Sequence, residues 1–488
     1  MATEKELKEV RIDKRAQLEG LGINTYPSDS NETHTAKELR ESFEEGKKVV
    51  IAGRVMSLRG QGAIMFSDIF DGTEKYQVVL KEDVKIKYTG VEVEDGFKLL
   101  KDTVDVGDFV EVTGVLFVTQ RGVESLEVHS WRMLSKAILP IPTEHFGIKD
   151  EDERYRKRYL DILSNPELRD MIEKKSKFWK VMRNFMEDKG FLEVTTPTLE
   201  ITTGGAEARP FTTYHNDFGM DVHLRISVGE LWQKRLMAAG FPKTFEIGKV
   251  YRNEGSSPEH LQEFTNMEFY WGYANYKDGM ELVKELYRKI AVDVFGKTKF
   301  EIRGYEFDLA DEWEEIDFVE RINEVTKIDI LTASVDEMKD AAKNLGVEWD
   351  GDNRERLIDT LWKYCRKQIS GPAFLVGHPT IVSPLAKNDV NKPGRVEEFQ
   401  PIIAGSEVGK GYSELNDPVD QQKRFEEQQK LIVAGDDEAM MPEWNFVEML
   451  EHGMPPTCGF GTGERLFAFL AGVSVREAQT FPLMRPKG

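Results

Sequence analysis

Between residues 49 and 131 the chain contains five short runs rich in valine, isoleucine and aromatic residues, bounded by turn-forming or charged residues. β-Branched and aromatic residues favour strands, and the glycines between the runs favour turns. Five strands this short bury enough surface only when they close on one another, so the pattern predicts a compact β-domain. The runs are VVIAGRVMSL (49–58), AIMFSDI (63–69), KYQVVL (75–80), FVEVTGVLFV (109–118) and VESLEVHSW (123–131).

Five strands with one longer excursion, at 81–107, fit a Greek-key barrel of the OB type, although another small β-domain would show the same pattern. The chain has 488 residues, which predicts more than one domain. A charged helix is expected at 3–20, and two prolines in ILPIPTEHFGIKD (138–150) indicate a linker. We therefore predict a first domain at 1–140, a linker at 141–153 and a second domain at 154–488.

The second domain mixes helices with extended segments. Pro166 suits a first helical turn, and apolar residues then recur on one face until Gly190, which predicts a helix over about 166–189. FLEVTTPTL continues as an extended segment, whereas residues 317–370 are helical by pattern and are interpreted as an insertion. The whole chain is therefore predicted to have an α+β fold.

Composition excludes several classes of protein. The net charge of −21 does not suit a protein that coats nucleic acid by overall attraction, although local contacts remain open. Two cysteines, Cys365 and Cys458, are too few for a disulfide framework or a cysteine-based zinc site. No apolar run reaches the roughly 20 residues that span a bilayer, and the charged start is unlike a signal peptide. We expect a cytoplasmic protein without a membrane partner.

The segment YRNEGSSPEHLQEFTNMEF (251–269) concentrates residues that suit a nucleoside triphosphate. Arg252 can bind a phosphate or a carboxylate through two hydrogen bonds, and His260 can meet a second phosphate. Phe264 offers a flat face for a purine, and Glu254 can accept from its amine. The chain has no GxxxxGK[ST] phosphate loop. A charged loop between two strands would be the plain alternative.

Two later segments carry compatible groups. In CGFGTGERLFAFL (458–470), three glycines let the backbone approach a ligand, and Arg465 follows where a helix begins. In GSEVGKGYSELND (405–417), Glu407 and Glu414 are seven residues apart, so they share a strand face only if a glycine bulge intervenes. One carboxylate could hold Mg²⁺ and the other could face a cationic substrate, but a solvated acidic loop is the alternative.

In order, the helix with EVTTPTL, then FEIGKVYRNEGSSPEHLQEFTNMEF, then GFGTGERLFAFL resemble the three motifs of class II aminoacyl-tRNA synthetases. The predicted barrel resembles that of the aspartyl, asparaginyl and lysyl subgroup. TTGGAEARPF (202–211), GYSELNDPVDQ (411–421) and FPLMRP (481–486) resemble the lysyl-tRNA synthetase family. The resemblance covers nearly the whole chain. It implies an OB-fold anticodon-binding domain and a catalytic domain built on an antiparallel sheet flanked by helices.

The resemblance also implies an activity: ATP-dependent ligation of L-lysine to tRNA(Lys) through a lysyl-adenylate. An aspartyl- or asparaginyl-type enzyme is the alternative, as is a non-charging tRNA-binding or protein-lysylating paralogue. Arg252 and Arg465 would be catalytic. ATP would meet Arg252, Glu254, His260, Phe264, Glu407 and Arg465. Lysine would meet Gly205, Ala206, Glu230, Tyr270, Tyr412 and Glu414.

Further partners follow from the same resemblance. One to three Mg²⁺ ions would bind Glu407, with Gln400 in a position where family members often carry glutamate. Lys410 stands where the family usually has asparagine, so its ammonium either points away from a cationic substrate or meets a phosphate. The anticodon would contact Arg59, Phe66, Gln77 and Glu124, although Phe66 could instead belong to the barrel core. The motif 1 helix and strand imply a homodimer.

Overall fold

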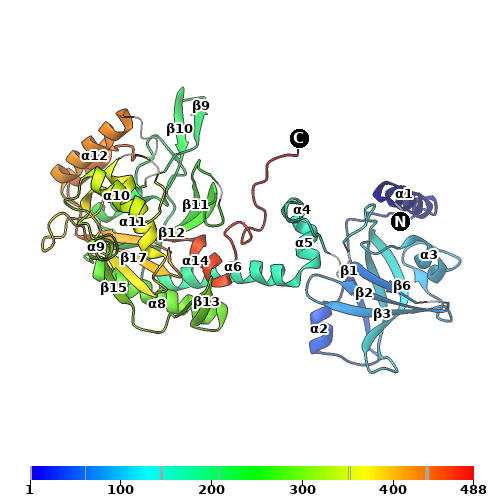
Figure 1. Cartoon of the computed structure of the whole chain (residues 1–488). Helices are drawn as coiled ribbons and strands as arrows, with labels where there is room; N and C mark the ends of the chain where they lie inside the picture. The colour runs from blue at the N-terminus through cyan, green and yellow to red at the C-terminus, as the bar shows by residue number, and fades with distance from the viewer. Residues whose placement is uncertain are drawn as a thin grey trace. The chain divides into compact units, whose positions relative to one another are not determined.

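The computed structural model describes residues 3–60, 62–142, 147–206, 208–255, 257–349, 351, 353–434 and 439–487. The chain forms two compact units, Met1–Ser164 and Asn165–Gly488 (Figure 1). The predicted linker at 141–153 includes residues 143–146, which lie outside the described residues. Helices α4 (Glu151–Arg156) and α5 (Arg158–Ser164) follow within the first unit. None of the described helices combines the length and the apolar character that a bilayer crossing needs.

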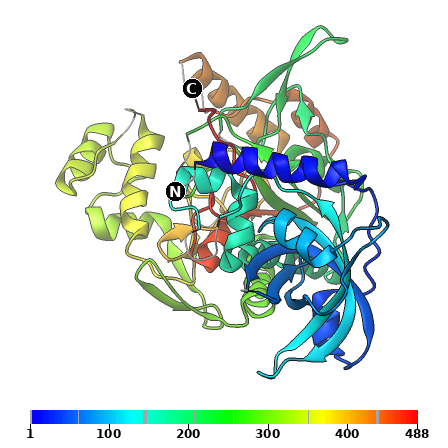
Figure 2. The same ribbon diagram turned by 90° about the vertical axis from the view of Figure 1, so that its right-hand side faces the viewer.

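The first unit is a closed barrel, as the five repeated runs predict. Its strands are ordered β3-β2-β1-β5-β6-β4, and a further pairing of β3 with β6 closes the sheet. Helix α1 (Glu4–Gly20) starts at a capping box on Thr3 and packs against α3 (Gly96–Thr103), which lies within the long excursion (Figure 2). The strands are β1 (Lys48–Arg59), β2 (Ile64–Phe70), β3 (Lys75–Lys81), β4 (Lys87–Tyr88), β5 (Phe109–Val118) and β6 (Glu124–Ser135).

The second unit is built on one large sheet with the order β15-β16-β17-β19-β20-β12-β11-β7, and β18 pairs with β17. Neighbours are antiparallel except at the two ends, where β11 pairs with β7 and β16 with β15 in parallel. The strands are β7 (Leu192–Glu193), β11 (Lys243–Tyr251), β12 (Glu263–Gly272), β15 (Glu314–Asp317), β16 (Ala373–Val376), β17 (Glu398–Ile403), β18 (Ser406–Glu407), β19 (Lys410–Ser413) and β20 (Thr457–Gly463).

Three helices cover one face of this sheet. Apolar side chains of α6 (Pro166–Asp188), α8 (Tyr276–Phe295) and α14 (Glu464–Ala471) form a single core with Met267 and Phe269 of β12. Helix α6 matches the predicted 166–189, and Pro166 occupies its first turn. The apolar face of α6 therefore packs against one face of the sheet. The other face of the sheet is not covered by these three helices.

Residues 317–370 contain three helices with an apolar core of their own: α9 (Phe318–Thr326), α10 (Val335–Asn344) and α11 (Arg354–Arg366). Figure 2 shows them in yellow-green, gathered at one edge of the second unit. Cys365 lies in this core and Cys458 in the main one, and both are buried free thiols. The α+β organisation predicted from the sequence, a small barrel followed by a sheet flanked by helices, is confirmed.

Candidate active site

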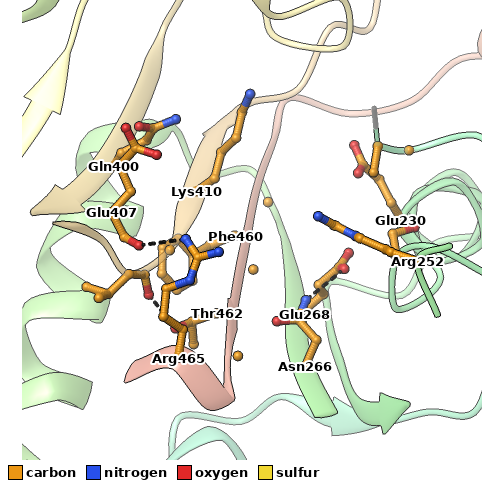
Figure 3. Close-up of a pocket in the computed structure, with 18 of the residues that line it drawn as sticks. Glu230, Arg252, Asn266, Glu268, Gln400, Glu407, Lys410, Phe460, Thr462 and Arg465 are labelled. Carbon is orange, nitrogen blue, oxygen red and sulfur yellow. Dashed lines mark hydrogen bonds between the residues drawn. The ribbon is translucent and has the colours of Figure 1, made fainter. Parts of the chain in front are cut away.

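A cavity lies on the open face of the sheet, and strand β12 explains why it is polar. Alternate residues of a strand point to opposite faces, so Phe264, Asn266, Glu268 and Tyr270 share one face while the residues between them enter the core or the neighbouring strands. Figure 3 shows Glu230, Arg252, Gln400, Glu407 and Arg465 around this cavity. Its lining includes every residue that the sequence predicts for amino acid, ATP and metal: Gly205, Ala206, Glu230, Arg252, Glu254, His260, Phe264, Tyr270, Gln400, Glu407, Tyr412, Glu414 and Arg465.

Two arginines define the cationic end of this cavity. Arg252 follows β11, and its Nε and Nη2 donate to the carbonyl of Ile226 at 3.4 and 3.3 Å. Arg465 is the second residue of α14, and its Nη1 donates to the backbone carbonyl of Glu407 at 3.3 Å (Figure 3). Burial lowers the pKa of both guanidiniums, which nonetheless stay charged because the arginine pKa begins far above neutrality. Two fixed cations therefore face one space.

The loop between β11 and β12 holds the remaining nucleotide-binding candidates. The Gln262 amide donates to the carbonyl of Glu254 at 2.9 Å, and the Arg252 amide donates to the carbonyl of Gln262 at 2.8 Å. His260 Nδ1 lies 2.7 Å from the Ser257 hydroxyl. Burial first, and the charge of Arg465 second, lower the pKa of His260. The Phe264 ring lies 5.5 Å from the Arg252 guanidinium carbon, which leaves a flat surface beside the cations.

The opposite, acidic end consists of Glu230, Glu268 and Glu414 with the hydroxyls of Tyr270 and Tyr412. The side chain of Glu414 is 1% exposed, and Glu230 and Glu268 are also buried. The Tyr412 hydroxyl donates to Glu230, and the Tyr270 hydroxyl donates to Glu268 at 3.2 Å. Three carboxylates that lie near one another in a buried space need cationic partners when they are ionised.

Gly459 of β20 is the reason that Tyr270 and Glu414 can lie side by side. A Cβ on Gly459 would overlap Glu414 Oε1 and would lie 2.7 Å from Tyr270 Cε1. The two side chains therefore meet over one glycine, as the predicted pocket for an alkyl ammonium requires. The short break between β18 and β19, at Val408 and Gly409, brings Glu407 into the same cavity despite its odd spacing from Glu414.

Sequence reasoning assigned no role to three residues of this site. Glu268 and Asn266 line the cavity, and their signal was the run of polar residues at alternate positions of an apolar strand. Lys234 is the third: its side chain is 1% exposed, and its ammonium lies 2.9 Å from Glu230 and 2.5 Å from Glu414. The spacing of four residues between Glu230 and Lys234 on α7 (Glu230–Ala238) was the available signal.

Burial makes two carboxylates of the acidic end unusually basic. It raises the pKa of Glu268 to about 7, helped by the nearby charge of Glu230. It raises the pKa of Glu414 to about 8 even though Lys234 opposes the shift. Burial alone would lower the pKa of Lys234, but Glu230 and Glu414 outweigh it and raise that pKa. Lys234 is therefore an ammonium at neutral pH.

The predicted metal ligands lie near the cationic end. Glu407 Oε1 accepts from the indole of Trp362 at 2.5 Å, and its Oε2 lies 3.4 Å from Arg366. Gln400 donates its amide hydrogen to Glu398 at 3.2 Å, which leaves its amide oxygen as the ligand atom. In the part of the chain that the structure describes, no three His, Cys, Asp or Glu residues form a metal-binding group. Oxygen donors this few suit Mg²⁺, which takes waters and phosphates as its other ligands.

The geometry also answers the question that Lys410 raises. Its ammonium lies 3.4 Å from Glu398, a carboxylate without exposed surface on β17. Figure 3 shows the Lys410 side chain extending away from Arg252 and Arg465. The cation therefore belongs to the Glu398 side of the cavity rather than to the acidic end.

The four anticodon candidates lie on β1, β2, β3 and β6 of the barrel. Phe66 stands between the buried Met65 and Ser67, so its ring is on the outer face and not in the core. Arg59 is paired opposite Phe66 and donates to Asp68 at 2.6 Å. Gln77 is the residue of β3 paired opposite Asp68, and Glu124 begins β6 where that strand runs beside β3. Aromatic, cationic and amide groups thus share neighbouring strands of the barrel.

Comparison with known proteins agrees with both units. Residues 150–485 match the family model of tRNA synthetases class II (D, K and N), and residues 49–134 match an OB-fold nucleic acid binding domain. Lysine–tRNA ligases of Thermotoga maritima and Roseiflexus are each 40% identical over 99% of this chain, covering 97% and 99% of their own lengths. The lysine–tRNA ligase of Pelotomaculum thermopropionicum is also 40% identical, with 95% of its length covered. The chain belongs to the class II tRNA synthetases and, within them, to the lysine–tRNA ligase family.

Proposed function

We propose that this protein ligates L-lysine to tRNA(Lys) at the expense of ATP, through a lysyl-adenylate intermediate. The observation that carries the proposal is the polarity of one cavity: Arg252 and Arg465 lie at its cationic end, and the carboxylate of Glu414 lies beside Tyr270 at its acidic end. A triphosphate suits the first end and an alkyl ammonium suits the second. An aspartate side chain would meet repulsion at Glu414, which favours lysine over the acidic substrates of the same subgroup.

Each end has a specific task in the proposed pose. The α-ammonium of lysine binds Glu230 and the backbone at Gly205 and Ala206, where a Cβ on Gly205 would press against Glu230. Glu414 and Tyr270 bind the ε-ammonium. Tyr412 holds Glu230 in place through its hydroxyl. A substrate without the side-chain amine leaves Glu414 unpaired in a buried space, and binding is then penalised.

The nucleotide lies toward the cationic end. Glu254 accepts from the adenine amine, Phe264 stacks on the ring and His260 meets the terminal phosphates. Arg252 bridges the lysine carboxylate and the α-phosphate, while Arg465 lies on the other side of the adenine. Each contact uses a group that the cavity already presents.

In this reaction no side chain acts as a nucleophile. The substrate carboxylate attacks the α-phosphorus in line, and pyrophosphate leaves. Arg252 and Arg465 hold both reactants and balance the charge that grows on the phosphate oxygens. Glu407, with the amide oxygen of Gln400, would hold Mg²⁺, which neutralises phosphate charge when bound. The lysyl group then moves from the adenylate to the terminal ribose of the tRNA.

Two partners complete the proposal. The outer face of the barrel reads anticodon bases, with Phe66 stacking and Arg59, Gln77 and Glu124 bonding to base edges. A second copy of the chain packs against the segment after α6, where Leu192, Leu199 and Ile201 are 49–66% exposed. Sedimentation of the wild type and of Ile201→Asp tests the dimer. A wild-type monomer at micromolar concentration refutes it.

The direct test is amino-acid-dependent exchange between ATP and pyrophosphate. We expect exchange with lysine and none with aspartate or asparagine. Exchange that depends on aspartate or asparagine would assign the chain to a sister enzyme. Binding of tRNA with no exchange for any of the three amino acids would indicate a non-charging paralogue.

A further inference from the structure

The acidic end already contains an ammonium group that belongs to the protein. Lys234 Nζ lies 2.9 Å from Glu230 Oε1 and 2.5 Å from Glu414 Oε2. The rings of Tyr270, Tyr412 and Phe446 surround it, with centroids 5.9, 5.5 and 5.7 Å away. A lysine side chain is rarely buried this completely unless its charge has an assigned partner. Lys234 has two, and both belong to the substrate pocket.

The closest contacts of Lys234 are to Oε1 of Glu230 and to Oε2 of Glu414. Glu230 Oε1 accepts from Lys234 and from the Tyr412 hydroxyl, whereas Glu230 Oε2 faces the backbone of Gly205. Neither oxygen of Glu414 has a geometrically formed hydrogen bond among the described residues: Oε2 lies 2.5 Å from the Lys234 ammonium, and Oε1 faces Gly459 and Tyr270. An unsatisfied buried carboxylate oxygen is costly unless a ligand supplies its donor. The two oxygens nearest Lys234, the inner ones, thus pair with its ammonium, and the two outer oxygens lie toward Gly205 and Gly459, which line the cavity.

The acidic end also has more carboxylates than cations. When all are ionised, as in the complex with substrate, Glu230, Glu268 and Glu414 carry three negative charges against the one ammonium of Lys234, so two negative charges then call for a further cation. Arg252, at the boundary with the cationic end, is matched in the proposed pose by the carboxylate of the substrate. A substrate with two ammonium groups therefore completes the balance, whereas one with a single ammonium leaves a buried charge.

We propose that Lys234 is a positioning residue that determines substrate specificity: its ammonium binds the inner oxygens of Glu230 and Glu414, turns their outer oxygens toward the substrate and supplies only one of the three positive charges that Glu230, Glu268 and Glu414 call for when all are ionised. The inference deepens the proposed function and rests on it. Lys234 touches no reacting atom and acts only through the two carboxylates. Its chemical counterpart is a substrate with two separated ammonium groups.

The test compares Lys234→Met with Lys289→Met in the lysine-dependent exchange reaction. Lys289 forms an exposed pair with Asp293 at the same spacing of four residues, so it is a matched control outside the cavity. We expect Lys234→Met to raise KM for lysine at least 10-fold while KM for ATP changes less than about threefold. Without the cation, Glu414 should hold its proton more tightly, so the pH profile of kcat/KM for lysine should move upward by about one pH unit.

A second variant keeps the test decisive if Lys234→Met fails to fold. Lys234→Gln retains a hydrogen-bond donor for the carboxylates but lacks the charge, and the same shift of pH profile is expected from it. Lys234→Ala leaves a cavity, and added methylammonium should partly restore KM for lysine and not KM for ATP. Equal losses for lysine and ATP, with an unmoved pH profile and no rescue, would show a purely structural role and overturn the inference. A wild type without lysine-dependent exchange would instead defeat the proposed function, and this inference with it.

Discussion

Individual side chains of the cavity have separable tasks because opposite charges gather at its two ends. The residues of the cationic end are arginines that stay charged under all physiological conditions. Those of the acidic end are buried carboxylates whose protonation depends on what lies beside them. Substitutions at the acidic end should therefore change the affinity for lysine and its pH dependence, while the affinity for ATP remains nearly unchanged.

Glu414→Gln should weaken lysine binding and leave ATP binding nearly unchanged. Removing the charge of a buried ion-pair partner costs about 2–5 kcal/mol, so KM for lysine should rise at least about 30-fold. Steady-state exchange kinetics, with each substrate varied in turn, measure both constants. An equal rise of KM for ATP would contradict the assignment of Glu414 to the ammonium.

Lysine affinity should increase as pH rises from 6 to 8. In the free enzyme the pKa of Glu268 is raised to about 7 and that of Glu414 to about 8, so both are largely protonated at pH 6. Lysine binds the ionised forms, so affinity grows as these protons leave and levels off above pH 8. Around them, Tyr270 and Tyr412 have pKa values well above their usual range and stay neutral, and Lys234 stays charged. Glu230 and the guanidinium of Arg252 are further charged groups close to Glu268.

Calorimetry in two buffers of different ionisation enthalpy measures the same effect at pH 7. Binding of lysine should release protons, because the incoming ammonium favours the ionised carboxylates. Binding without proton release, together with an affinity that is constant between pH 6 and 8, would be inconsistent with protonated carboxylates in the free pocket.

At the scale of elements, the site depends on strand alternation and on glycines that let strands approach. Strand β12 sends Met267 and Phe269 to the core and Asn266, Glu268 and Tyr270 to the cavity. Strand β20 runs beside it with glycine at alternate positions, so its backbone forms the floor of the cavity. Any side chain on that floor would occupy space that the substrate groups need.

Gly459→Ala should therefore displace side chains of the lysine pocket. Its Cβ would overlap Glu414 Oε1, and overpacking of this kind typically costs about 1–3 kcal/mol. We expect a rise in KM for lysine of roughly 5- to 150-fold and a smaller change for ATP. Gly20→Ala, at a position with nothing within 4 Å of the new Cβ, is the control. Unchanged lysine kinetics in Gly459→Ala would show that Glu414 can move without loss.

At the scale of the whole molecule, two compact units divide the proposed work. The cavity lies entirely within Asn165–Gly488, and the anticodon candidates lie entirely within Met1–Ser164. Activation of lysine needs only the unit that holds the cavity, whereas charging of tRNA needs both units. Variants of the barrel should therefore separate the two half-reactions.

Phe66→Ala should impair charging of tRNA and leave exchange unchanged. Stacking of one base on an aromatic ring is worth about 1–3 kcal/mol, so KM for tRNA should rise roughly 5- to 150-fold. Aminoacylation and exchange assays on the same preparation give both values. Loss of exchange in this variant would mean that the substitution disturbs more than the outer face of the barrel.

The sequence by itself determined the elements and most of the site. Runs rich in valine, isoleucine and aromatic residues located the barrel strands, Pro166 and Gly190 bounded α6, and the motif segments, with the family resemblance that they carry, indicated residues that line one cavity. The strands and α6 were predictable because β-propensity and helix caps are local properties of the chain, while the roles of the cavity residues stay predictions. Glu268 was within reach of the same reasoning, since it shares a strand face with Tyr270.

Only the tertiary structure decided how charges pair across distance. Nothing near Lys234 in sequence indicates Glu414, which lies on another element, and nothing near Lys410 indicates that its ammonium turns to Glu398. A long flexible side chain can reach many partners. Its ion-pair partner is therefore determined by which carboxylate is buried without another cation after the strands have packed. Burial likewise sets the raised pKa values of Glu268 and Glu414, because desolvation exists only after the chain has folded.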